Sequence, residues 1–77
     1  YYVYLLKCAD GTIYTGCTSN IEERLIRHKK GYVHYTQTKL PVSLISFSAF
    51  TEKFKAFEFE KYLKTGSGRA FARKRLV

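Results

Sequence analysis

The chain has 77 residues and a formal net charge of +8, because 14 lysines and arginines face six acidic residues. This length allows one domain, and the 45% hydrophobic and 17% aromatic content is enough for a compact core and excludes a disordered chain. No apolar run approaches the roughly 18 residues of a membrane span. The first seven residues lack the basic flank of a signal peptide. We therefore expect no membrane partner.

Two cysteines, Cys8 and Cys17, are too few for the disulfide framework of a small secreted domain. We expect them to be reduced and mostly buried thiols in a cytoplasmic protein. A structural zinc site needs about four ligands, and His28 and His34 lack the spacing of a zinc finger.

The positive charge is concentrated in residues 61–77, which hold lysines and arginines but no acid. A basic end of this kind favours a phosphate-rich partner. A solvated basic tail that keeps the protein in solution is an equal alternative.

Residues 2–8 and 12–18 are rich in β-branched and aromatic residues and predict two strands. The intervening Ala9-Asp10-Gly11 predicts a hairpin with a three-residue loop and Gly11 in the left-handed conformation. We expect the side chains of both strands to pack, because apolar residues occur on both faces of the sheet. Those on the second face are Val3, Leu5 and Ile13.

The three-residue loop sets the register of the hairpin. It pairs Leu6 with Tyr14 and Tyr4 with Gly16. Opposed residues point the same way, so Tyr4 and Tyr14 are expected on one face of the sheet.

Ser19-Asn20-Ile21-Glu22 fits a capping box and predicts a helix that runs to about Lys30 and ends at Gly31. Arg24 and His28 are four residues apart and share one face of this helix. Residues 31–41 are expected as a loop.

The alternating residues 42–50 predict a third strand. Thr51 is expected to cap a second helix over about 52–64, and Gly66-Ser67-Gly68 to interrupt the chain before a short basic helix to about Leu76. The order β-β-α-β-α-α predicts an α+β domain, a three-stranded and mainly antiparallel sheet flanked by helices.

The few carboxylates limit the chemistry. Most fall in a turn or in the first turn of a helix, which leaves Glu58 and Glu60. A two-metal nuclease with several convergent aspartates is excluded, and so is a Ser-His-Asp hydrolase, because the single Asp10 lies in a turn.

Glu60 lies in an apolar arc when its helix is drawn at 100° per residue. The arc consists of Ala56, Phe57 and Leu63. A carboxylate in apolar surroundings needs a partner. One interpretation is an ion pair with Lys64 or Arg24, and the other is a ligand for a hydrated divalent metal.

The order and spacing of several residues give a sharper indication. Tyr2-Val3-Tyr4 followed by Tyr14-Thr15-Gly16 resembles the paired motif of the GIY-YIG endonuclease family. The loop with Gly31, His34-Tyr35-Thr36 and Pro41-Val42 also resembles its small single-domain bacterial branch. The family has an essential arginine on the next helix, a His or Tyr one turn later and a metal-binding glutamate on a later helix. Arg24, His28 and Glu60 match these positions.

The resemblance implies a metal-dependent DNA endonuclease. Glu60 would bind Mg²⁺ or Mn²⁺, Arg24 would neutralise the phosphate, and Tyr4 or Tyr14 would orient or deprotonate the attacking water. His28 would relay a proton or hold a phosphate, and a packing role fits it equally.

DNA is the expected partner, with RNA as the alternative, and the protein is expected as a monomer that another protein or a fused domain recruits. We expect selection of nicks, flaps or branches over base sequence, because the surface is small. The loop residues Tyr32 and Tyr35 are candidates for stacking on bases. The candidate nucleic-acid contacts are Lys29, Lys30, Tyr35, Lys64, Arg69, Arg73, Lys74 and Arg75.

The chain departs from the family in three places. The motifs read YVY and YTG, and many members have an asparagine after the glutamate helix where this chain has Gly66-Ser67-Gly68-Arg69. Ser67 or Arg69 is a candidate replacement. Without one, the alternative is a catalytically weak or inactive nucleic-acid-binding module on the same fold. A purely structural domain would show no salt-dependent binding.

Overall fold

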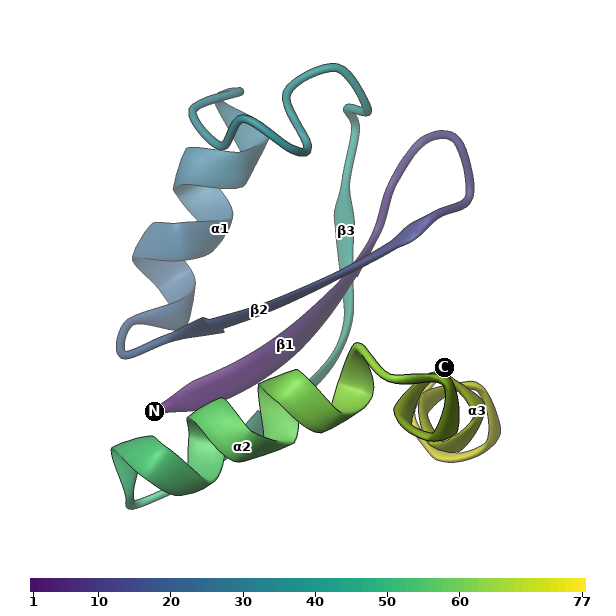
Figure 1. The fold of residues 1–77 in the computed structure, drawn as a ribbon. Helices are drawn as coiled ribbons and strands as arrows, with labels where there is room; N and C mark the ends of the chain where they lie inside the picture. The colour runs from purple at the N-terminus through teal and green to yellow at the C-terminus, as the bar shows by residue number, and fades with distance from the viewer.

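The computed structural model describes residues 1–77 and has the predicted order of elements, β-β-α-β-α-α (Figure 1). The strands are β1 (Tyr2–Lys7), β2 (Ile13–Thr18) and β3 (Ser43–Ala49), and the helices are α1 (Ile21–Lys29), α2 (Lys53–Leu63) and α3 (Gly66–Arg75). None of these helices has the length and apolar character needed to cross a bilayer.

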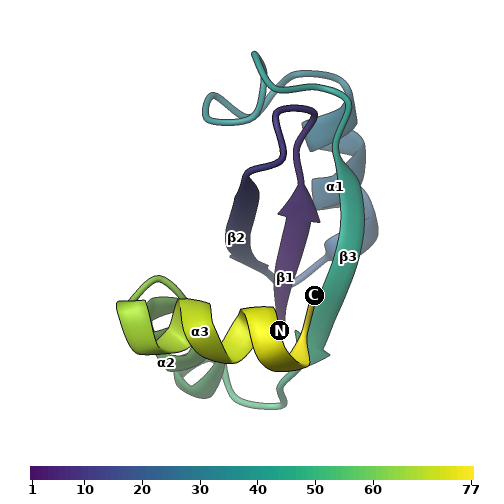
Figure 2. The ribbon, with the colours of Figure 1, turned by 90° about the vertical axis from the view of Figure 1, so that its right-hand side faces the viewer.

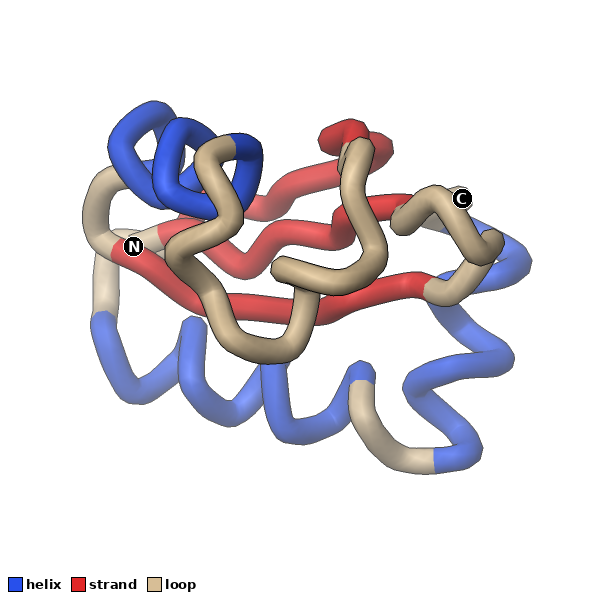
Figure 3. The backbone as a smooth tube through the Cα atoms, turned by 90° about the horizontal axis from the view of Figure 1, so that it is seen from above, coloured by secondary structure: helices blue, strands red, loops and turns tan.

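The three strands form one antiparallel sheet in the order β2-β1-β3, so β1 is central and the other two are edges (Figure 2). Helix α1 covers one face of the sheet, and α2 and α3 cover the other (Figure 3). The predicted fold class and the cover on both faces are confirmed.

The register of the β1–β2 hairpin is the predicted one. Tyr4 is opposite Gly16, and Leu6 is opposite Tyr14. Gly11 closes the three-residue loop with a φ of 87°, in the left-handed region that glycine tolerates. Asp10 stays in this turn, where its carboxylate accepts hydrogen bonds from Thr12.

Two small apolar clusters hold the layers together. The cluster under α1 contains Tyr4, Leu6, Cys8 and Val42, and the cluster under α2 and α3 contains Val3, Ala56, Leu63 and Ala72. Ile13 shares the second face but is 40% exposed, because β2 is an edge strand. Both cysteines are free thiols.

The helix caps correct two of the predictions. Asn20, and not Ser19, caps α1, because its side-chain oxygen accepts a hydrogen bond from the Glu23 amide at 3.1 Å. Asparagine is as good an N-cap as serine, so either of these neighbouring residues is able to cap the helix. The N-cap of α2 is Glu52, and not Thr51, and no side chain caps that helix. Gly31 ends α1 as predicted, with a φ of 79°.

Residues 66–68 do not form the break between two helices that was predicted for them. They form the first turn of α3, whose cap is Thr65 through a hydrogen bond from the Gly68 amide at 3.1 Å. A Cβ at Gly68 would overlap the backbone carbonyl of Tyr62. The glycine therefore lets α3 pack directly against the end of α2.

Candidate active site

An aromatic cluster lies between the sheet and α1, beside the edge strand β2. The ring centroids of Tyr4 and Tyr14 are 6.2 Å apart, those of Tyr14 and His28 are 5.0 Å apart, and those of Tyr14 and Tyr35 are 5.5 Å apart. The two tyrosines share a face, as predicted from the hairpin register. The structure thus brings together residues from β1, β2, α1 and the loop after α1.

A buried chain of hydrogen bonds fixes the orientation of His28. Its Nε2 lies 2.9 Å from the Tyr4 hydroxyl, and its Nδ1 lies 2.8 Å from Thr36 Oγ1. The Thr36 hydroxyl is placed to donate to the Val33 carbonyl, so it accepts from Nδ1–H, and Nε2 accepts from Tyr4. All three side chains are fully buried. The His28 side chain therefore has no direct contact with solvent.

Burial keeps the side chains of Tyr4 and His28 uncharged. It raises the pKa of the Tyr4 hydroxyl above its ordinary value, the neighbouring Tyr14 adds to the effect, and the positive charge of Arg24 opposes it. Burial also lowers the pKa of His28, and Arg24 lowers it further. At neutral pH, Tyr4 is a neutral hydrogen-bond donor and His28 a neutral acceptor.

Arg24 is a half-buried cation without an acidic partner. The two ion pairs of the protein are Lys39–Asp10 and Lys64–Glu60, and neither includes Arg24. Its charge acts on the pKa values of Tyr4 and His28, so its guanidinium lies close to the aromatic cluster. A guanidinium in this position can hold a phosphate oxygen through its planar fork.

Glu60 lies on the buried side of α2, between Ala56 and Leu63, with 24% of its side chain exposed. Its carboxylate pairs with Lys64 at 3.1 Å, which is one of the two partners considered from the sequence. Phe57 is 42% exposed, so only Ala56 and Leu63 of the predicted arc are buried.

The thiol of Cys17 is influenced by the charges of both Glu60 and Arg24. Burial raises the pKa of this thiol, the negative charge of Glu60 raises it further, and the positive charges of the N-terminus and Arg24 oppose the shift. Both charges therefore act on the same residue of β2. Glu60 belongs to α2, on one face of the sheet, and Arg24 belongs to α1, on the other.

The donor set limits the metal that the site can hold. No group of three or more His, Cys, Asp or Glu side chains is close enough to enclose an ion. One half-buried carboxylate fits Mg²⁺ or Mn²⁺, because a hydrated hard cation needs only one or two carboxylates and takes its other oxygens from water and substrate phosphates. It does not fit a structural zinc site.

Two residues of the site were not predicted. A Cβ at Gly16 would overlap the Tyr4 ring, so glycine is required opposite Tyr4 for the tyrosine to lie flat across β2. The position of Gly16 in the YTG motif was the one indication of this requirement in the sequence. Thr36 lies in the loop after α1, and no pattern in the sequence indicated that it would meet His28.

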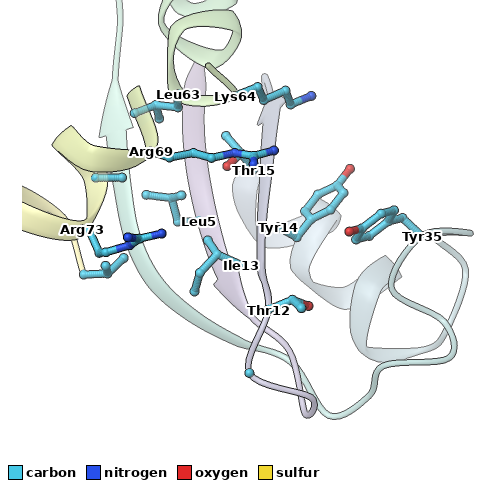
Figure 4. Close-up of a pocket in the computed structure, with 13 residues that line it drawn as sticks. Leu5, Thr12, Ile13, Tyr14, Thr15, Tyr35, Leu63, Lys64, Arg69 and Arg73 are labelled. Atoms are coloured by element: carbon cyan, nitrogen blue, oxygen red, sulfur yellow. The ribbon is translucent and has the colours of Figure 1, made fainter. Parts of the chain in front are cut away.

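The predicted nucleic-acid contacts separate into two groups. Lys64, Arg69, Arg73 and Tyr35 line one groove together with Tyr14 (Figure 4). The others lie outside that groove and are exposed. They are Lys29, Lys30, Lys74 and Arg75. Ser67 is also exposed, and no hydrogen bond joins Ser67 or Arg69 to Glu60.

Comparison with known proteins agrees with this arrangement. A UPF0213 protein of Staphylococcus saprophyticus is 40% identical to this chain, and the alignment covers 87% of this chain and 83% of the relative. A UPF0213 protein of Natronomonas pharaonis is 41% identical, and the alignment covers 84% of this chain and 78% of the relative. The solution NMR structure of a UPF0213 protein from Bacillus halodurans superposes with a TM-score of 0.60 at 35% identity, covering 95% of this chain and 79% of that one. The model of the GIY-YIG catalytic domain matches residues 1–74, and the chain therefore belongs to the GIY-YIG family.

Proposed function

We propose that this protein is a divalent-metal-dependent DNA endonuclease that hydrolyses phosphodiester bonds. Membership of the GIY-YIG family supports a nuclease. The observation that supports it most within the structure is Arg24, a half-buried arginine that has no carboxylate partner and whose charge acts on Tyr4 and His28. Such a cation is costly to bury unless an anion completes the site, and a scissile phosphate is that anion.

Arg24 would bind a non-bridging oxygen of the phosphate and neutralise the charge that develops during attack. Glu60 would hold Mg²⁺ or Mn²⁺ at the β2 edge. A bound divalent ion at this position supplies Lewis-acid stabilisation of the phosphate and the leaving oxygen. Lys64, which pairs with the Glu60 carboxylate at 3.1 Å, would move aside to a phosphate of the substrate.

Tyr14 would contact the attacking water. Tyr4 is fully buried and already donates to His28, whereas Tyr14 is half-buried and lines the groove. The water oxygen would bond to phosphorus as its proton passes to the Tyr14 oxygen, while the hydroxyl proton of Tyr14 passes on to solvent. The ester P–O bond would break, and the leaving oxygen would take a proton from solvent. His28 would hold Tyr4, and through it the Tyr14 ring, in place.

The substrate would be chosen by shape more than by base sequence, because this small domain offers little surface for reading base edges. If the protein neutralises about five phosphates of a duplex, the slope of log affinity against log salt should be near −4.5. The free thiols support a reducing compartment such as the cytoplasm, and we propose that the protein acts there as a monomer.

A binding module without catalysis is the second candidate. It is favoured by the pairing of Glu60 with Lys64 and by the absence of a hydrogen bond from residues 66–69 to that carboxylate. A nuclease and a binding module both bind DNA, so only cleavage distinguishes them.

The test is nicking of supercoiled plasmid in Mg²⁺, in Mn²⁺ and in EDTA. We expect nicking that depends on the metal, and its loss in Glu60→Gln. Glu58→Gln is the matched control, because Glu58 is exposed on the same helix and should leave nicking unchanged. Salt-sensitive binding without nicking would support the binding module instead.

A further inference from the structure

A groove of about 680 Å³ runs along the outer edge of β2 to α3. Tyr14 and Tyr35 lie at one end, and Arg69 and Arg73 of α3 extend over the other (Figure 4). Its volume falls within the roughly 300–1,000 Å³ of pockets that enclose small organic ligands, a size that suits one or two nucleotides. Because Tyr14 lines it, the groove reaches one residue of the candidate active site.

The rim of the groove is positively charged. Lys64, Arg69 and Arg73 are among its 13 lining residues, and none of the 13 is acidic. Arg69 and Arg73 take part in no ion pair. They are four residues apart on one face of α3, about 6 Å along the helix axis, which lets each contact a different phosphate of one strand.

The floor of the groove is apolar. Leu5, Ile13 and Leu63 line it, and Ile13 is 40% exposed there. Tyr35 at its end is 52% exposed, and the Lys39 amine lies 4.2 Å from the ring centroid on one side. An intact duplex keeps its bases stacked and offers phosphates, sugars and base edges, whereas an unpaired strand also offers base faces to apolar and aromatic side chains.

We propose that this groove binds an unpaired DNA strand, with phosphates on Arg69 and Arg73 and a base stacked on Tyr35. If the protein is the proposed nuclease, the groove leads a single-stranded flap or overhang to Tyr14 and so selects junctions between paired and unpaired DNA. The groove itself needs neither a metal ion nor catalysis to bind the strand.

The test measures fluorescence anisotropy of a labelled single strand of about 12 nucleotides and of the blunt duplex of the same sequence. EDTA is present throughout, so the result does not depend on cleavage. We expect tighter binding of the single strand. In Arg69→Gln/Arg73→Gln, the slope of log affinity against log salt for the single strand should become shallower by about 0.7 for each lost phosphate contact.

The matched control is Lys53→Gln/Lys55→Gln, which removes the same charge from exposed residues of α2 outside the groove. Its slope should stay at the wild-type value. Tyr35→Leu should weaken single-strand binding by about fivefold or more through lost stacking and leave duplex binding unchanged. Tighter binding of the duplex than of the single strand would overturn the proposal, and so would an equal change of salt slope in the two double variants, even if plasmid nicking were established. If the expected binding results were obtained without nicking, the groove proposal would stand and the proposed nuclease function would fail.

Discussion

The hydroxyl of Tyr4 lies 2.9 Å from Nε2 of His28, and this buried hydrogen bond ties the central strand to α1. It gives the two motif tyrosines different environments, although they share a face of the sheet. Tyr4 is fully buried and has a raised pKa, while Tyr14 is half-buried and lines the groove. The two residues should therefore respond differently to the same substitution.

Tyr14→Phe should reduce the rate of DNA cleavage by about 10²-fold or more, because it removes the group that contacts the water. Its urea midpoint should change little. Tyr4→Phe should instead lower the free energy of unfolding by about 1–3 kcal/mol, because the buried Nε2 of His28 loses its donor. Single-turnover cleavage and urea denaturation of both variants measure the difference. A larger loss of cleavage in Tyr4→Phe than in Tyr14→Phe would reverse the roles.

Stability should depend on pH through His28. Its pKa in the folded protein is lowered from the ordinary 6.5, so the unfolded chain binds more protons below that value. Stability should be complete above about pH 6.5 and should fall below it, by at most about 1.4 kcal/mol per pH unit for one proton, until the pH passes the lowered pKa.

His28→Gln should flatten this dependence, and His34→Gln should keep it, because His34 is an exposed loop residue. Urea midpoints between about pH 5 and pH 7.5 give the measurement. Equal pH dependence of the wild type and His28→Gln would show that another group is responsible.

Gly16→Ala should destabilise the protein by about 1–3 kcal/mol or more, because the added methyl group overlaps the Tyr4 ring. Gly66→Ala is the control: a Cβ there meets no atom within 4 Å, and its effect on stability should be small. Thermal unfolding of both variants tests this. An unchanged midpoint in Gly16→Ala would mean that the Tyr4 ring can move aside.

The hairpin was predictable in detail because local chemistry determines it. Gly11 allows the three-residue loop, and the loop length determines which residues face each other. That register is enough to place Tyr4 and Tyr14 together. Arg24 and His28 follow from helical spacing alone, which is why most of the aromatic cluster could be predicted.

Other features depend on contacts that no local pattern encodes. The N-caps of α1 and α2 each lie one residue after the predicted position. Asn20 and Ser19 are equally good caps for α1, and no side chain caps α2. Thr36 meets His28 only through the path of the loop after α1. Gly68 was interpreted as a helix breaker, but its role is the close packing of α3 against α2.

The most direct test of the account is the single-turnover rate at which Arg24→Gln cleaves a labelled DNA flap in Mn²⁺. Arg27→Gln is the control, because Arg27 is exposed on the same helix. Loss of a group that stabilises the developing charge predicts a rate about 10²–10³-fold below wild type for Arg24→Gln, with a normal rate for Arg27→Gln. Cleavage at the wild-type rate in Arg24→Gln would contradict the assignment of this site.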